Sequence, residues 1–180
     1  MIKQYFALYP FAATADVSSV TATVDILRSS SMLAVNCEFH GSLDGILIPC
    51  TAESRYRKDK LWEQTCFEVF LAVRNSPSYW EFNFSPAGHW NVYSFEAYRK
   101  EMKEEAAFSE LPFSVHYEEG HALSCSVEID LNKIVRADSR LEAAVNSVMK
   151  LRDGTLTYWA STHNDGRPDF HRRDSFIIDL

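Results

Sequence analysis

The chain has 180 residues, enough for one domain with a sizeable hydrophobic core and too few to require a second domain. Its 18 Lys and Arg residues are outnumbered by 25 Asp and Glu residues, and the net charge of −7 argues against nucleic acid as a partner. Residues 1–15 contain no continuous apolar stretch, so we expect no signal peptide, no membrane partner and a cytoplasmic location.

Alternation of apolar and polar residues with a period of two dominates the chain and predicts strands along most of its length. In chain order, the expected strands are residues 20–26, 33–39, 45–49, 61–71, 79–85, 90–95, 113–117, 123–131, 141–150, 155–162 and 175–180. The alanines of 141–150 also allow a helix there, and strand is favoured. Residues 97–111 are expected to form a solvated loop or a single helical turn.

Short strands joined by turns that contain Gly, Asn, Pro and Ser are typical of an all-β fold. No internal repeat or linker-like segment interrupts them. The sequence therefore predicts one domain over residues 1–180, an antiparallel β-sandwich of jelly-roll type with little helix.

The segment 61–71 separates two kinds of side chain onto two faces of its predicted strand. Phe67 and Leu71 point to one face, which we expect to be core, whereas Trp62 and Glu68 share the other. A tryptophan and a carboxylate on one face make this strand the first candidate for a binding site.

Two later strands repeat this arrangement. Glu81 and Asn83 alternate with phenylalanines, and near the C-terminus Trp159 and His163 fall in the polar row of their strand. Indole planes mixed with hydrogen-bonding groups suit a sugar, whose C–H faces stack on aromatic rings while its hydroxyls pair with polar side chains. The alternative is the ordinary polar face of an antiparallel sheet exposed to solvent.

Metal binding has little support in the sequence. Histidines 163 and 171, with Asp165 or Asp169, allow a metal site on the loop 162–173, but the spacing is weak and a hydrogen-bonded loop is favoured. The four cysteines lie far apart without a Cys-x-x-Cys spacing, so we expect buried thiols rather than zinc ligands. They are Cys37, Cys50, Cys66 and Cys125.

Catalysis is also weakly indicated. Glu68 and Glu81, on neighbouring predicted strands, are the only candidates for a glycosidase-like acid and nucleophile pair. No nucleophile elbow and no phosphate-binding glycine loop is present. We assign no catalytic residue and keep a glycosidase as an alternative.

Several runs together resemble the DOMON-like domains of bacterial proteins, which are relatives of the family 9 carbohydrate-binding modules. The resemblance spans about residues 5–180, and its most specific part is the run Leu-Trp-Glu-Gln-Thr-Cys-Phe-Glu at residues 61–68. The other runs are Glu-Phe-Asn-Phe-Ser-Pro at 81–86, Trp-Asn-Val-Tyr at 90–93, Tyr-Arg at 98–99, Tyr-Trp-Ala at 158–160 and Pro-Asp-Phe-His at 168–171.

The resemblance implies a jelly-roll sandwich whose relatives bind sugars or, in other branches, haem. In the sugar-binding modules two tryptophans clamp the terminal sugar, and a glutamate six residues after the first one holds its hydroxyls. Trp62 and Glu68 have this spacing, and Trp159 is the candidate for the second tryptophan.

The predicted function is therefore a non-catalytic domain that binds a carbohydrate or a similar polyhydroxylated small molecule, without a cofactor. Haem or metal binding is the alternative, although none of the candidate axial ligands lies in a recognisable haem signature. Those candidates are Met102, Met149, His163 and His171. The complete predicted ligand set is Trp62, Glu68, Glu81, Asn83, Arg99, Trp159, His163 and His171.

Overall fold

The computed structural model describes residues 2–180, and within this range the chain forms twelve strands. In order they are β1 (Ile2–Pro10), β2 (Thr21–Ser29), β3 (Met32–His40), β4 (Cys66–Val73), β5 (Tyr79–Phe84), β6 (Trp90–Phe95), β7 (Lys103–Glu104), β8 (Phe113–Glu118), β9 (Ala122–Asp130), β10 (Leu141–Lys150), β11 (Leu156–Ala160) and β12 (Ile178–Asp179). Short 3₁₀ turns are η1 (Ala15–Val17), η2 (Leu61–Glu63), η3 (Leu131–Lys133) and η4 (Arg173–Ser175).

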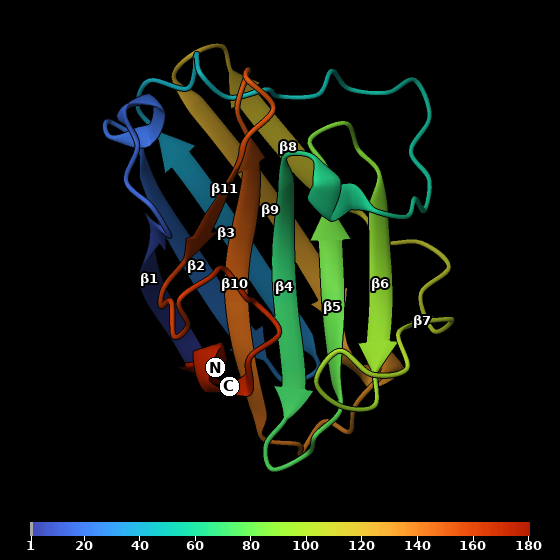
Figure 1. Cartoon of the computed structure of the whole chain (residues 1–180). Coiled ribbons are helices and arrows are strands. Elements are labelled where there is room, and N and C mark those ends of the chain that lie inside the picture. Colours follow the sequence, from blue (N-terminus) through green and yellow to red (C-terminus); the bar gives the residue numbers. More distant parts are fainter. Residues whose placement is uncertain (1) are drawn as a thin grey trace.

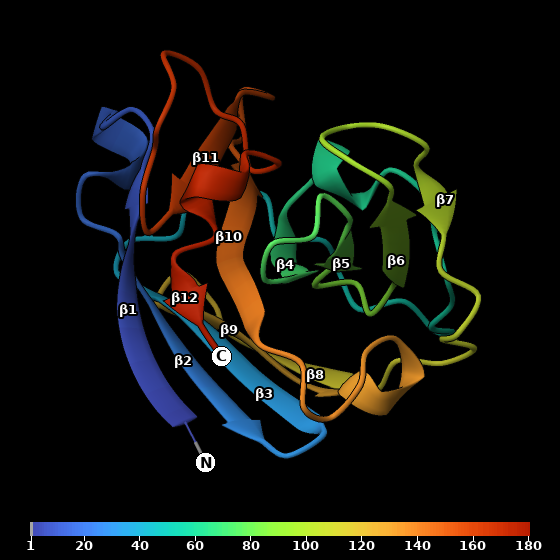
Figure 2. The same ribbon diagram turned by 90° about the horizontal axis from the view of Figure 1, so that it is seen from below.

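The strands form two facing layers that share β1 (Figures 1 and 2). The first sheet has the order β7-β6-β5-β4-β10-β11, with β12 also paired to β10, and the second has the order β1-β2-β3-β9-β8. Most of β1 pairs with β2, whereas its end, Tyr9 and Pro10, pairs with β11. All pairings between strands are antiparallel, so the predicted all-β sandwich is confirmed.

The main core lies between the two sheets and follows from the alternation in the sequence. Inward side chains of β2 and β3, such as Ile26 and Phe39, meet inward side chains of the first sheet, such as Phe67 and Leu71. All four are at most 2% exposed. Each large apolar side chain buried in this way contributes roughly 1.5–3 kcal/mol to folding.

A second apolar cluster covers the face of the first sheet that points away from the second sheet, here called the outer face. It contains Phe70, Tyr79 and Phe95 from the sheet, together with Phe170 and Phe176 from the C-terminal segment that lies over it. Both faces of β4 are therefore buried, which explains its nearly continuous apolar sequence. The outer face is a covered surface and not a solvent face.

The structure corrects several expectations about the elements. Residues 141–150 form strand β10, as favoured, but residues 45–49 contribute only an isolated bridge between Ile46 and Leu151. Residues 61–63 form the 3₁₀ turn η2 and not the start of a strand, because Lys60 adopts a left-handed conformation, with φ of 58°, that breaks the extended backbone.

Two further differences concern exposure and a missed strand. Cys50 is exposed, contrary to the expectation of four buried thiols, whereas Cys37, Cys66 and Cys125 are buried. Strand β1 was not predicted, because its sequence does not alternate regularly and its pairing depends on β2 and β11. Residues 97–111 form the expected loop, which also contains the short β7.

Candidate functional site

Polar side chains cross the outer face of the first sheet in a transverse row. The row consists, in order across β10, β4, β5 and β6, of Asn146, Glu68, Asn83 and Asn91. Directly paired residues of antiparallel strands point to the same face, so these four side chains lie side by side. Each is at most 3% exposed, and Glu81 lies in the next row. A row of buried polar groups is costly unless its hydrogen bonds are satisfied.

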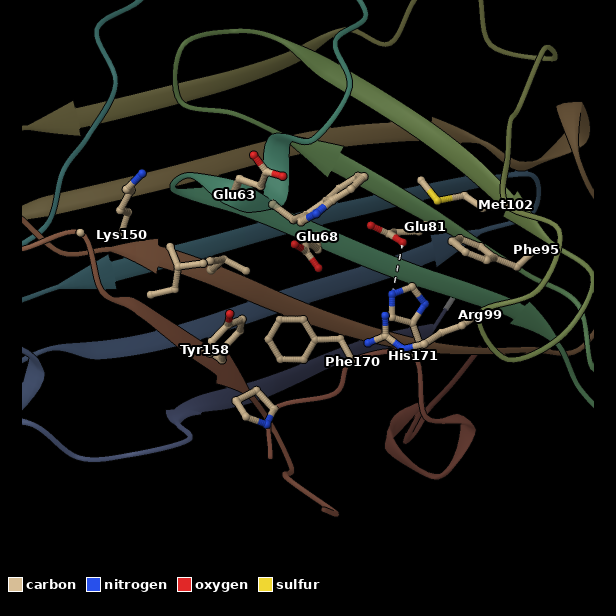
Figure 3. Close-up of a pocket in the computed structure, with 15 residues that line it drawn as sticks. Glu63, Glu68, Glu81, Phe95, Arg99, Met102, Lys150, Tyr158, Phe170 and His171 are labelled. Atoms are coloured by element: carbon tan, nitrogen blue, oxygen red, sulfur yellow. Dashed lines mark ion pairs between the residues drawn. The ribbon is translucent and has the colours of Figure 1, made fainter. Parts of the chain in front are cut away.

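A pocket of about 510 Å³ opens over these rows (Figure 3). Strands β4, β5 and β10 supply its floor, including both glutamates. Its walls come from η2, from residues 95–102, from the β10–β11 hairpin and from residues 168–171. Segments far apart in the sequence therefore converge on one cavity of the size that holds a small molecule.

Aromatic side chains from η2, from β11 and from the C-terminal segment line this pocket. Trp62 projects from η2, is half-buried, and packs edge-on against Tyr93 with ring centroids 5.6 Å apart. The Tyr93 hydroxyl donates a 2.6 Å hydrogen bond to Asp59, which fixes this ring beneath the indole. Tyr158 of β11 packs edge-on against Phe170, with ring centroids 5.9 Å apart. The pocket thus offers flat apolar surfaces above a polar floor.

The two glutamates on the floor have unusual environments. Oε1 of Glu68 is buried and has no hydrogen-bond partner within residues 2–180. Burial, followed by the nearby Glu81 carboxylate, raises the pKa of Glu68 well above its usual value, although Arg99 acts in the opposite direction. Burial also raises the pKa of Glu81 to about 7, against a 2.8 Å hydrogen bond from Asn83 that lowers it. Both carboxyl groups on the floor therefore bind a proton more tightly than an exposed glutamate does.

His171 lies over the floor next to Glu81. Its Nε2 is 3.8 Å from Glu81 Oε2 (Figure 3). Its Nδ1 shares a 2.7 Å hydrogen bond with the Tyr79 hydroxyl. Burial, and then the positive charge of Arg99, lower the pKa of His171 to about 4. The imidazole is therefore neutral at pH 7 and serves as a hydrogen-bonding group.

Arg99 also lines the pocket, and it contacts the segment that carries His171. It adopts a left-handed backbone conformation with φ of 52°, and its guanidinium forms a 2.9 Å ion pair with Asp169. Asp169 also accepts a hydrogen bond from the Tyr98 hydroxyl, and its carboxylate accepts one from the His171 amide at 3.1 Å. These contacts hold residues 168–171 against the loop that follows β6.

Five residues of the predicted ligand set line this one pocket. They are Trp62, Glu68, Glu81, Arg99 and His171. Asn83 lies beneath it, fully buried, and donates to Glu81 while accepting from the thiol of Cys66. Asn83 therefore supports the carboxyl group and does not line the cavity.

Two predicted residues lie elsewhere. Trp159 is 1% exposed and belongs to the core between the sheets, where it packs against Phe39, so its assignment to the polar face was wrong. Its indole N–H donates to Thr157. His163 bonds to the carbonyl of Tyr9 at the end of β1 and does not line the pocket.

Sequence reasoning missed several pocket residues. The prediction that Trp159 lies in the polar row put its neighbour Tyr158 on the opposite, core face, but Tyr158 lines the pocket, and Phe170 was not selected at all. A signal was available for Phe170, because an aromatic residue in an otherwise charged loop needs an apolar partner. Asn146 belongs to the buried row and does not line the pocket, and no local pattern identifies it, since its position depends on the pairing of β10 with β4.

Two searches of the described chain, residues 2–180, bear on the alternatives. Its His, Cys, Asp and Glu side chains form no group of three or more placed to hold a metal ion. No helix in this part of the chain is long and apolar enough to cross a membrane. Of the four candidate haem ligands, Met102 and His171 line the pocket, whereas Met149 lies in the core.

Fold and site together define a β-sandwich with a pocket on the outer face of one sheet. No protein-family model matches the sequence, and a search of curated proteins finds no match. Solved structures do match. A candidate carbohydrate-binding protein from Bacteroides uniformis aligns with a TM-score of 0.66 and 12% identity, covering 97% of this chain and 84% of that one.

A family 9 carbohydrate-binding module from Caldicellulosiruptor kristjanssonii is also similar. Its complex with cellotriose aligns with a TM-score of 0.53 and 11% identity over 91% of this chain and 74% of that one. Its complex with glucose gives a TM-score of 0.51 and 11% identity over 94% and 78%. At these identities the likeness establishes a shared fold.

Proposed function

We propose that the protein is a non-catalytic binding domain for a carbohydrate or a similar polyhydroxylated small molecule, held in the pocket over β4, β5 and β10. The observation that carries the proposal is the presence of two carboxyl groups, those of Glu68 and Glu81, on the floor of a cavity with aromatic walls. Buried carboxyl groups need hydrogen-bond partners, and ligand hydroxyls in the pocket would supply them.

The walls and the floor offer the two kinds of contact that a sugar uses. Trp62, Tyr158 and Phe170 present apolar ring surfaces to C–H groups, whereas Glu68 and Glu81 present carboxyl oxygens to hydroxyls. With Trp159 in the core, the second aromatic wall would be Tyr158 with Phe170, and not a second tryptophan. The structures with similar folds that hold cellotriose and glucose support the same ligand class.

Titration with glucose, galactose, xylose, cellobiose and cellotriose, followed by calorimetry and by tryptophan fluorescence, tests the proposal. We expect saturable binding of at least one sugar at millimolar concentration or below, and at least tenfold weaker binding by Trp62→Ala. Trp80→Phe is the matched control, because Trp80 lies outside the pocket with its indole N–H bonded to Glu105. No heat and no fluorescence change with any of these sugars would contradict the proposal.

A glycosidase-like activity is the second candidate, favoured by the presence of two buried carboxyl groups with raised pKa in one pocket. It predicts hydrolysis of chromogenic glycosides that Glu68→Gln abolishes. Sugar binding by the wild type without any such hydrolysis would leave the binding domain as the function.

A further inference from the structure

A short chain of hydrogen bonds ends at His171 in the pocket wall. The backbone N–H of Arg99 donates to the hydroxyl oxygen of Tyr79 at 3.2 Å, and the same hydroxyl shares a 2.7 Å hydrogen bond with Nδ1 of His171. Tyr79 is fully buried, and its ring is stacked on that of Phe95 with centroids 4.6 Å apart. Its hydroxyl is therefore held in a fixed position next to the imidazole.

The direction of this chain determines which nitrogen of His171 carries the proton. A backbone N–H can only donate, so the Tyr79 oxygen accepts from Arg99 and its own hydrogen can donate to Nδ1. If Nδ1 carried the proton, the Tyr79 oxygen would accept twice, and its hydrogen would have no acceptor within residues 2–180. The imidazole is neutral, because its pKa is lowered to about 4. The network therefore assigns its single proton to Nε2.

Nε2 of His171 lies close to the carboxyl group of Glu81. It is 3.8 Å from Oε2, which is too long for a direct hydrogen bond (Figure 3). The other oxygen of Glu81, Oε1, accepts from Asn83. Both His171 and Glu81 line the pocket, and neither Nε2 nor Oε2 is among the closed-off polar atoms that lack a partner within residues 2–180. A donor and an acceptor thus lie next to each other at the pocket surface.

This pair restricts the chemical group that can bind to it. A hydroxyl oxygen can accept from Nε2 and donate to Oε2, since one oxygen can lie at hydrogen-bond distance from two atoms that are 3.8 Å apart. An ammonium group has no acceptor for the Nε2 proton. A carboxylate would be repelled by Glu81 at pH 8, which is above the pKa of about 7 of that residue. A hydroxyl group therefore fits the pair best.

We propose that Tyr79 is a positioning residue that holds the proton of His171 on Nε2, so that His171 and Glu81 together bind one hydroxyl group of the ligand. This inference rests on the proposed function and specifies one position of the same pocket. It assigns a role to Tyr79, which does not itself line the pocket, and it makes His171 a hydrogen-bond donor to the ligand.

NMR of protein labelled with ¹⁵N-histidine, recorded at pH 8 without sugar, tests the assignment of the proton. The chain has 6 histidines, and the signals of His171 are those that disappear in His171→Phe. We expect His171 to carry its proton on Nε2, with Nδ1 as a hydrogen-bond acceptor. A proton on Nδ1 would overturn the inference, whatever the protein binds.

Calorimetric titration at pH 8 tests the binding of the hydroxyl group. Glucose, galactose, xylose, cellobiose and cellotriose are the first probes, followed by the singly deoxygenated derivatives of the tightest binder. We expect one deoxygenated position to weaken binding at least tenfold in the wild type but less than threefold in His171→Phe, which has no donor. The new ring fits the site, because Phe70 and Phe95 already contact the imidazole edge-on.

The variant Tyr79→Phe tests the positioning role, since it removes the hydroxyl and keeps the stacked ring. The loss caused by the same deoxygenation should fall from at least tenfold to less than fivefold. A purely structural role would weaken binding of the parent sugar and of every derivative by the same factor. Tyr5→Phe, exposed on β1, is the matched control and should change neither value. Circular dichroism confirms that each variant is folded, and His171→Phe decides alone if Tyr79→Phe is not.

The outcomes separate this inference from the function on which it rests. If sugars bind the wild type but no deoxygenated position is affected by the changes at His171 and Tyr79, the inference is wrong and the proposed function stands. If none of the probes binds the wild type, both are wrong.

Discussion

The indole of Trp159 packs edge-on against the ring of Phe39, with centroids 5.2 Å apart, in the space between the two sheets. This contact connects β11 of the first sheet with β3 of the second. Trp159→Ala should therefore lower the free energy of unfolding by about 3–5 kcal/mol, as large-to-small changes in cores do. Urea denaturation measures this, and Trp159→Phe, which keeps a ring at the site, should lose much less.

Trp62 should behave in the opposite way. Its indole is half-buried at the pocket wall, so Trp62→Ala removes little core packing and should lower the free energy of unfolding by about 1 kcal/mol or less. The same urea experiment measures this effect. A loss as large as that of Trp159→Ala would mean that Trp62 is a core residue and would undermine its assignment as a binding surface.

The contrast between these two tryptophans shows where sequence patterns suffice. In β4, Phe67, Val69 and Leu71 alternate with Glu68, and the structure places them on the predicted core face. In β11 the alternation separates the two faces correctly. It does not show which face points to the core between the sheets, because both faces are covered. The partners of Tyr158 and Trp159 in β10 are Val148 and Ser147, and the serine is the one that faces the core. The polarity of the side chains therefore assigned the core face of β11 incorrectly.

The site was partly predictable for a related reason. Glu68 and Glu81 could be placed together because both belong to adjacent strands with clear alternation. The pocket wall formed by residues 168–171 could not be placed from the sequence. Phe170 and His171 reach the floor only when the C-terminal segment lies over the outer face. That arrangement depends on tertiary contacts, such as the ion pair of Arg99 with Asp169, that no local pattern encodes.

The raised pKa of Glu81 predicts a specific pH dependence of stability. Between its ordinary value of 4.5 and about 7 the folded state holds a proton that the unfolded state releases, so stability falls as pH rises through this range. The lowered pKa of His171 acts in the opposite direction, since its contribution is lost as pH falls from 6.5 to about 4. The two effects partly cancel in the wild type.

The variant Glu81→Gln separates the effects of Glu81 and His171 on stability. The variant keeps the effect of His171 and loses that of Glu81, so its stability relative to the wild type should increase between pH 4.5 and 7, by about 3 kcal/mol at most. Urea denaturation at half-unit steps of pH measures the difference. A difference that stays constant over this range would show that Glu81 titrates normally in the folded protein.

Glu68 should lower the free energy of unfolding while it contributes to ligand binding. The residue is 3% exposed and one of its carboxyl oxygens is unpartnered within residues 2–180, so the folded state bears the cost of burying it. Glu68→Met replaces it with an apolar side chain of similar length. At pH 8, where the unfolded state favours the ionised form, the change should raise the free energy of unfolding by about 1–3 kcal/mol.

The same change should abolish sugar binding, because the floor loses one of its two carboxyl groups. Glu128→Met is the matched control: Glu128 is exposed on β9, so the change should alter the free energy of unfolding by less than about 0.5 kcal/mol and leave binding intact. Urea denaturation and calorimetry on the same samples give both quantities. If Glu68→Met were less stable than the wild type at pH 8, the buried carboxyl group would be stabilising, and the unpartnered oxygen would need a partner within the fold.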